Sequence, residues 1–402
     1  MVGLLLLSAC TTVLTRSAVP EDKIDNAAPY GIASEKVLVR AWGDEFGFDE
    51  DRLEALVQGL AARTLEAKRE EVAAGDPIVQ VALALSGGGP DGAYGAGYLN
   101  GWTARGDRPQ FDAVTGISTG AIIAVFAFLG PDYDQALTEV YTTYDTDQLF
   151  TPTLFAGVTG GTALTDSRGY RRLIERYLDD RVVERLAEAF RDGRSLLVGT
   201  TNIDAARPVI WNLGAIAASG HPDARTLIQD IIQASSAIPA VFPPVLIPVV
   251  TADGRTYDEM HVDGGATQQV TLLSADVSML QLDEAMGVTI DRSLYIIINN
   301  KLEKPYEPVR PRLFSIAGKA ASSLIGGSGT GDIYRLFTIA ERDRIDFNVT
   351  WIPADFEAEP AELFDPVYMK ALYDLGYSHG LAGDTWKSVP PGYRPWPAPP
   401  SE

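Results

Sequence analysis

The feature that most constrains the fold of this 402-residue chain is a near-continuous apolar run of strand length at residues 78–85. Such a run suits a strand with both faces buried, as in a parallel sheet covered by helices. Similar runs recur along the chain, and helical patterns separate them, as at residues 170–189. Strands that alternate with helices predict βαβ units, so we expect an α/β fold. The other runs lie at 111–117, 195–201, 209–213, 294–299 and 347–352.

Composition limits the classes of protein that fit. The chain has 33 Lys and Arg against 54 Asp and Glu, a net charge of −21, which disfavours binding to nucleic acid. Hydrophobic residues make up 46% and charged residues 22%, as in a globular protein with a sizeable core. No apolar run reaches 18 residues, so no membrane-spanning helix is predicted. The histidines and the single cysteine lack metal-ligand spacing, so neither a metal nor another cofactor is expected.

The single cysteine, Cys10, ends a short apolar and small-residue segment at residues 4–9. That segment has the outline of a secretory signal meeting its cleavage site. The tetrad Leu-Ser-Ala-Cys resembles the bacterial lipoprotein box, in which the cysteine becomes lipidated after cleavage. The alternative is an ordinary free or buried cysteine. No Lys or Arg precedes the apolar run, which leaves open a start upstream of Met1.

Further local signals indicate the membrane, one loop and the division of the chain into parts. Thr11 stands where an Asp would indicate inner-membrane retention, which points to the outer membrane of the bacterial envelope. The glycines at 326–331 predict a flexible surface loop. The four parts are a lipoprotein-type signal at 1–10, a tether and lead-in at 11–47, a single domain at 48–389 and a Pro-rich tail at 390–402.

Three short segments carry the chemistry. The first, S-G-G-G-P-D-G at residues 86–92, directly follows the first predicted strand. Its glycines allow backbone N–H groups to converge on one point and cradle an oxyanion or a phosphate. A nucleotide loop fits poorly, because the Lys-Ser/Thr ending of a P-loop is missing and Asp91 lies inside the segment.

The second segment is G-I-S-T-G at residues 116–120, between a predicted strand and a helical run. This is the G-x-S-x-G nucleophile elbow in its strand–turn–helix context. Gly116 and Gly120 flank the serine because a Cβ would clash in so sharp a turn. Ser118 would then present its Oγ at a helix N-terminus, where the helix dipole favours negative charge.

The third segment is D-G-G at residues 263–265, at the end of a predicted strand. A carboxylate is needed to accept a serine proton, and only tertiary structure could bring Asp263 to Ser118. The alternative is an ordinary Asp-Gly turn. His261 shares a strand face with Asp263, so it could tune that carboxylate, but a plain surface or edge histidine is the favoured interpretation.

Together these segments resemble the patatin-like phospholipases, a family of lipid acyl hydrolases. The likeness covers roughly residues 78–280, and residues 364–377 look like the family's closing helix. The motifs that carry it are S-G-G-G-x-x-G at 86–92, G-I-S-T-G at 116–120, A-S-S-A-I-P at 234–239 running into F-P-P at 242–244, and D-G-G at 263–265.

The resemblance implies a three-layer α/β/α sandwich with a mostly parallel sheet, and an enzyme that cleaves acyl esters of lipids, of phospholipase A, lysophospholipase or lipase type. Ser118 matches the nucleophile, and Asp263 matches the base of a Ser–Asp dyad that uses no histidine. The oxyanion-hole amides match Gly87, Gly88 and Gly89. The remaining motif glycines are Gly92, Gly116, Gly120, Gly264 and Gly265.

One position departs from the family pattern. Members usually carry Arg or Lys before the position of Gly92, and this chain has Asp91. This reversed charge, together with the net charge of −21, argues against anionic phospholipid as the preferred substrate. Catalysis is less affected, because backbone amides remain in the loop.

Two other functions stay open. An α/β-hydrolase triad needs the order Ser…Asp…His, which Ser118, Asp263 and His379 satisfy formally. Against the triad, His379 follows a helical pattern and the 234–239 block would have no role. The second is a membrane-tethered binding protein with an inactive hydrolase fold. The favoured hypothesis is a lipid-anchored enzyme of the bacterial envelope, whose partners are a lipid or acyl-ester substrate and the membrane reached through lipidated Cys10.

Overall fold

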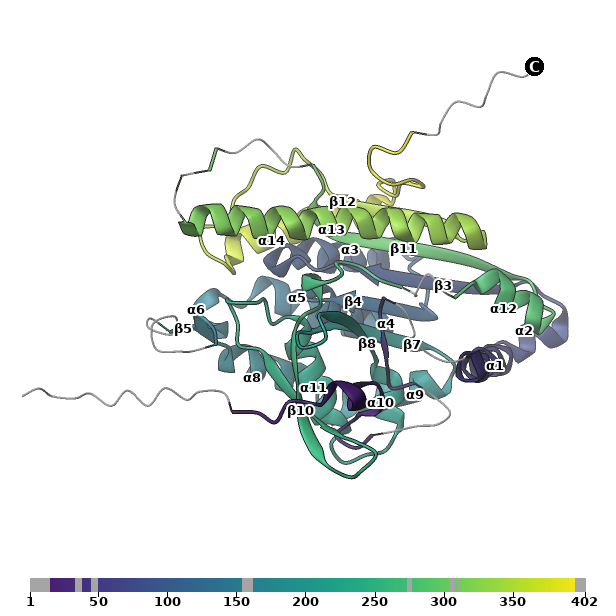
Figure 1. Cartoon of the computed structure of the whole chain (residues 1–402). Helices are drawn as coiled ribbons and strands as arrows, with labels where there is room; N and C mark the ends of the chain where they lie inside the picture. The colour runs from purple at the N-terminus through teal and green to yellow at the C-terminus, as the bar shows by residue number, and fades with distance from the viewer. Residues whose placement is uncertain are drawn as a thin grey trace, which may run out of the picture.

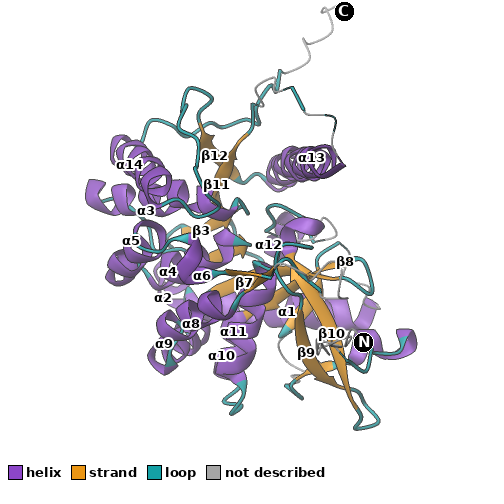
Figure 2. Ribbon diagram, turned by 90° about the vertical axis from the view of Figure 1, so that its left-hand side faces the viewer, coloured by secondary structure: helices purple, strands orange, loops and turns teal. Residues whose placement is uncertain are grey.

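A mixed sheet forms the centre of the molecule, and helices cover both of its faces (Figure 1, Figure 2). The computed structural model describes residues 15–32, 38–44, 50–153, 162–272, 277–303, 308–309, 311 and 313–394. Within these ranges the sheet has ten strands. They are β1 (Ala28–Pro29), β2 (Arg40–Trp42), β3 (Ile78–Leu85), β4 (Ala113–Ile117), β7 (Ser195–Asn202), β8 (Arg207–Asn212), β9 (Val245–Val250), β10 (Thr256–Asp263), β11 (Ile290–Lys301) and β12 (Asp346–Ile352).

The strand order is β1-β9-β10-β7-β4-β3-β11-β12, and β8 pairs with both β7 and β2. The strands from β7 to β12 along this path pair in parallel. The other pairings, on the β7 side of the sheet, are antiparallel. The predicted α/β fold with a mostly parallel sheet between helical layers is confirmed, while the antiparallel extension through β8, β9 and β10 was not predicted.

The helices form the two outer layers. Successive residues of the central strands point to opposite faces and reach different cores: Leu83 and Leu85 join the larger core, and Ala84 joins the smaller one. This explains the unbroken apolar runs of the sequence. The helices are α1 (Glu50–Ala67), α2 (Arg69–Ala74), α3 (Gly92–Arg105), α4 (Thr119–Leu129), α5 (Asp134–Thr142), α6 (Thr146–Leu149), α8 (Arg168–Tyr177), α9 (Asp180–Arg191), α10 (Leu213–Ala218), α11 (Ala224–Ser235), α12 (Met279–Met286), α13 (Leu313–Asp343) and α14 (Pro366–Ala382).

The N-terminal segment differs from the predicted tether. Residues 15–32 and 38–44 lie on the domain, where β1 pairs with β9 and β2 pairs with β8. Arg40 of β2 forms a buried ion pair with Glu259 of β10. Strands of two and three residues show no periodicity, so the sequence could not indicate them. Cys10 and the rest of the predicted signal lie outside the described residues.

The glycines at 326–331 lie inside α13, so the predicted flexible loop is wrong. Apolar side chains of the following turns, such as Leu336 and Phe337, pack on the smaller core, and this packing outweighs the poor helix propensity of glycine. The start of the predicted tail also packs here, since the Tyr393 ring lies 4.9 Å from that of Phe337. Neither this helix nor any other in the described ranges combines the length and apolar character needed to cross a membrane.

Helices α3 and α14 approach each other to backbone contact. A Cβ built on Gly376 would lie 2.1 Å from the carbonyl oxygen of Tyr94, and one on Gly97 would lie 2.0 Å from that of Tyr373. Gly101 and Gly380 repeat the arrangement one turn further along each helix. The closing helix that the resemblance implied is therefore held against α3 by small residues at four-residue spacing.

This contact predicts unequal effects of two glycine-to-alanine changes. Gly376→Ala should lower the free energy of unfolding by about 1–3 kcal/mol, because the new methyl group overlaps a backbone carbonyl. Gly331→Ala in α13 should be neutral or stabilise by up to about 1 kcal/mol, because no atom lies within 4 Å of its added Cβ. Urea denaturation of both variants measures the difference, and equal effects would contradict the close packing.

Candidate active site

Ser118 lies in the sharp turn between β4 and α4, with φ 56° and ψ −126°. This left-handed backbone region is rare for any residue except glycine, and it is kept only where surrounding structure enforces it. The turn leaves no room for side chains on either side. A Cβ on Gly116 would lie 2.2 Å from the carbonyl oxygen of Gly120, and one on Gly120 would lie 2.5 Å from that of Leu85. The structure thus has the geometry of a nucleophile elbow.

The pairing of strands in the sheet brings Asp263 next to Ser118. Asp263 ends β10, and it pairs in register with Thr200 of β7, the strand next to β4. The Ser118 hydroxyl donates a 2.7 Å hydrogen bond to Asp263 Oδ2, while Asp263 Oδ1 accepts one of 2.7 Å from the Gly265 amide. Burial raises the pKa of Asp263 to about 7, and these two hydrogen bonds oppose the shift.

The A-S-S-A-I-P block supports both residues. Ser235 Oγ accepts a 2.9 Å hydrogen bond from the Ser118 amide and donates one of 2.7 Å to the Gly199 carbonyl. The Ala237 carbonyl accepts a 2.9 Å hydrogen bond from the Asp263 amide. The block therefore fixes the backbone of the elbow and the end of β10 together, which the sequence motif alone did not explain.

The glycine loop offers fewer free amides than the sequence implied. The Gly87 amide donates a 3.1 Å hydrogen bond to the Gln269 carbonyl, so it is not available to an oxyanion. Gly88 and Gly89 are left as candidate donors for an oxyanion. Gly89 has φ +58°, and a Cβ on Gly88 would lie 2.1 Å from the Asn299 carbonyl oxygen, so both positions need glycine. Gly92 begins α3, and Gly264 with Gly265 forms a 3₁₀ turn after Asp263.

Asp91 does not stand free beside the elbow. The Tyr368 hydroxyl of α14 donates a 2.6 Å hydrogen bond to Asp91 Oδ1. Burial raises the pKa of Asp91 to about 6, and the bond from Tyr368 opposes this shift. The carboxyl group therefore ties the glycine loop to the closing helix, and its presence in the motif says less about substrate charge than the sequence suggested.

The histidines do not join Ser118 and Asp263. His379 lies on α14, with Nδ1 3.2 Å from the Tyr94 hydroxyl, whereas the Asp263 oxygens contact Ser118 and Gly265. His221 accepts a 3.2 Å hydrogen bond from the Asp223 amide. The triad is thus not assembled in the described structure.

His261 is buried and is not the surface or edge histidine that the sequence favoured. Its Nδ1 lies 2.9 Å from Thr200 Oγ1, and its Nε2 lies 3.1 Å from Glu259 Oε2. Burial lowers the pKa of His261. Burial opposes ionisation of Glu259, but the charge of Arg40 and the hydrogen bonds from His261 and Arg40 outweigh it and lower the pKa of Glu259 to about 2. This polar network lies on the same face of β10 as Asp263.

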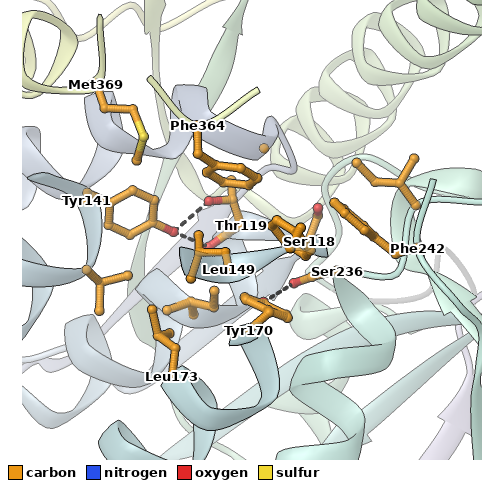
Figure 3. Close-up of a pocket in the computed structure, with 15 residues that line it drawn as sticks. Ser118, Thr119, Tyr141, Leu149, Tyr170, Leu173, Ser236, Phe242, Phe364 and Met369 are labelled. Atoms are coloured by element: carbon orange, nitrogen blue, oxygen red, sulfur yellow. Dashed lines mark hydrogen bonds between the residues drawn. The ribbon is translucent and has the colours of Figure 1, made fainter. Parts of the chain in front are cut away.

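An apolar pocket with a cavity volume of about 50 Å³ opens beside Ser118 and is partly open to solvent (Figure 3). Three rings stack along one wall: the Phe150 centroid lies 4.2 Å from that of Phe242 and 5.4 Å from that of Phe364. Ile238 and Phe242, from the A-S-S-A-I-P and F-P-P motifs, contribute to the lining. Other lining residues come from α4, α5, α6, α8 and α14, and only Thr119 and Met369 among them lie in segments that the family resemblance singled out: Thr119, Ile122, Val140, Tyr141, Leu149, Tyr170, Leu173 and Met369.

Residues 83–276 match the family model described as patatin-like phospholipase, a region just under half of the chain. This match supports a lipid acyl hydrolase family. The crystal structure of VipD from Legionella pneumophila is similar over 78% of this chain and 68% of its own, with 12% sequence identity and a TM-score of 0.37. No curated protein matches the chain. In the part that the structure describes, no three His, Cys, Asp or Glu side chains are grouped to hold a metal ion.

The raised pKa of Asp263 predicts a stability gain from its removal. The folded state binds the proton more tightly than the unfolded chain, whose carboxyl pKa is near 3.8, so this group costs stability as the pH rises from 3.8 through about 7. Asp263→Asn keeps an acceptor without the charge. At pH 8 this variant should have a free energy of unfolding that is higher by a few kcal/mol at most, and therefore a higher melting temperature. At pH 4 the increase should be much smaller. Equal shifts at both pH values would contradict the buried carboxylate.

Proposed function

We propose that this protein is a serine hydrolase of lipid acyl esters that uses a Ser118–Asp263 dyad. The observation that carries the proposal is the 2.7 Å hydrogen bond between Ser118 Oγ and Asp263 Oδ2 at the wall of an apolar pocket. A strained serine with an acceptor carboxylate, at the wall of an apolar pocket, is suited to nucleophilic attack on an ester.

In the first half-reaction, ionised Asp263 accepts the hydroxyl proton as Ser118 Oγ attacks the ester carbonyl. The amides of Gly88 and Gly89 would donate to the oxyanion, a contribution of about 3–4 kcal/mol for a typical donor. Protonated Asp263 then gives its proton to the oxygen of the leaving alcohol, and the acyl group stays on Ser118. In the second half-reaction Asp263 accepts a proton from water, whose oxygen attacks the acyl group, and the proton returns to Ser118 as the acid leaves.

The apolar wall supports an acyl chain as the group bound next to Ser118. Phe150, Phe242 and Phe364 present stacked rings to the pocket, and they offer no charged partner for a headgroup. Phospholipid, lysolipid and neutral ester share the acyl chain that this wall would hold. Hydrolysis of neutral, zwitterionic and anionic esters by the purified protein separates these substrates.

Variants of two residues test the dyad against the triad. Ser118→Ala should abolish turnover and covalent labelling by a fluorophosphonate probe, with an unchanged far-ultraviolet circular dichroism spectrum. His379→Ala should retain activity within about twofold, because His379 contacts Tyr94 and not Asp263. Loss of activity in His379→Ala would favour the triad. Failure of the folded wild-type protein to label would favour a binding protein.

The pH dependence of activity tests Asp263 as the base. Because only its ionised form accepts the proton, kcat/KM should rise about tenfold per pH unit below its pKa of about 7 and level off above it. Initial rates on a soluble ester between pH 5 and pH 9 measure this profile. A rate that stays constant from pH 5 to pH 9 would exclude a base with a pKa near 7.

We also propose that Cys10 carries the lipid anchor of a bacterial envelope protein, as the lipoprotein-type box suggests. Metabolic labelling with a fatty acid in a bacterial host should modify the wild-type chain and leave Cys10→Ser unlabelled. Activity on a soluble ester should be the same for both, since the dyad is independent of the anchor. Labelling of the Cys10→Ser chain would contradict the assignment.

A further inference from the structure

Several exposed apolar residues adjoin, along the chain or through a hydrogen bond, residues that line the pocket beside Ser118. We call Leu164, Pro239, Ala240, Leu363 and Val367 the mouth rim. Val367 is 80% exposed, Leu164 57% and Leu363 41%, which are high values for large aliphatic side chains. Single exposed aliphatic residues are ordinary on a protein surface, but a group at the opening of an apolar pocket indicates a binding surface.

The rim residues are joined to the pocket wall through the chain and through hydrogen bonds. Leu363 directly precedes Phe364, whose ring covers one end of the aromatic stack. The Leu164 amide donates a 3.0 Å hydrogen bond to the Ala240 carbonyl, two residues before Phe242 at the other end of the stack. The rim therefore flanks both ends of the stacked wall.

Figure 1 and Figure 3 show where the elements next to the rim lie. The start of α14 and the hairpin of β5 (Thr151–Pro152) and β6 (Thr165–Asp166) lie at one end of the molecule, on the left of Figure 1. Figure 3 places Phe364 and Phe242 on the side of the pocket nearest Ser118. The two phenylalanine rings that adjoin the rim thus line the same pocket as the serine.

The charges near the rim define the kind of surface that fits it. The segment from residue 353 to residue 365 leads into α14 and contains exposed Asp355, Glu357, Glu359 and Glu362. These carboxylates, in a chain of net charge −21, repel an anionic surface and are screened as salt is added. An apolar rim with acidic residues beside it suits a lipid layer whose headgroups are neutral or zwitterionic and whose acyl chains lie beneath them.

We propose that the mouth rim seats this protein on a neutral or zwitterionic lipid–water interface, so that an acyl chain passes from the lipid into the pocket beside Ser118. The inference rests on the proposed function and names the physical form of its substrate. Burial of the rim side chains among acyl chains supplies the free energy of association. It also lets a lipid leave its layer without crossing water.

Variants in α14 and in the segment just before it test the proposal. Leu363→Ser with Val367→Ser removes two rim side chains that do not line the pocket. Leu381→Ser is the matched control, because Leu381 is 45% exposed near the other end of α14, about 20 Å from Val367. All samples are the full chain with Cys10→Ser, so that no anchor contributes, and binding to phosphatidylcholine vesicles is measured by flotation.

We expect the double variant to bind these vesicles at least about tenfold more weakly and the control to bind as the parent does. Hydrolysis of vesicle lipid should fall in the same proportion, while hydrolysis of a soluble short-chain ester stays unchanged. Added phosphatidylglycerol should weaken binding at low salt. Equal binding by the double variant and the parent, equal loss in the control, or stronger binding to anionic vesicles would each overturn the proposal.

The same measurements separate this inference from the enzymatic function. A parent protein that binds vesicles through the rim and hydrolyses no ester would support the rim and contradict the hydrolase. A parent protein that hydrolyses the soluble ester and does not float with vesicles would support the hydrolase and overturn the rim.

Discussion

The hydrogen bond between Ser118 Oγ and Asp263 Oδ2 is the interaction on which the site depends. Its partners are 145 residues apart in the sequence and meet because β4 and β10 both border β7. The bond is made inside the protein, where a carboxylate is poorly solvated, so Asp263 is a stronger base than an exposed aspartate would be. The sheet that aligns the two strands therefore also sets the chemistry of the pair.

Keeping a carboxylate and a strained serine in place requires support from several sides. The Ser235 hydroxyl accepts a hydrogen bond from the Ser118 amide, and the Ala237 carbonyl accepts one from the Asp263 amide. Further along β10, the buried ion pair of Glu259 with Arg40 attaches the N-terminal segment to the strand that carries Asp263. Removal of one partner of such a pair leaves a buried charge without compensation, so the segment before β3 is part of the framework of the site.

Much of the fold followed from local patterns. The run at 78–85 is β3 with the predicted bounds, because its last three residues are buried on both faces of the sheet and all three must be apolar. The pattern was least informative where pairing is short or where packing outweighs propensity. β1 and β2 are too short for periodicity, and the glycines at 326–331 lie in α13 because the residues after them pack on the smaller core. His261 was misjudged since its burial depends on strands β7 and β9 beside it.

The sequence by itself determined the elbow around Ser118, since its G-x-S-x-G pattern lies between a strand and a helix and Gly116 is required by a backbone contact within the turn, while Gly120 also faces the end of β3. It also indicated which carboxylate was a candidate partner. Tertiary structure alone decided that Asp263 touches Ser118 and that His379 does not, that the Gly87 amide is already bonded, and that Asp91 faces Tyr368. It alone assembled the pocket from five helices. These outcomes depend on contacts between segments far apart in the chain, whose free energies are not written in any local pattern of residues.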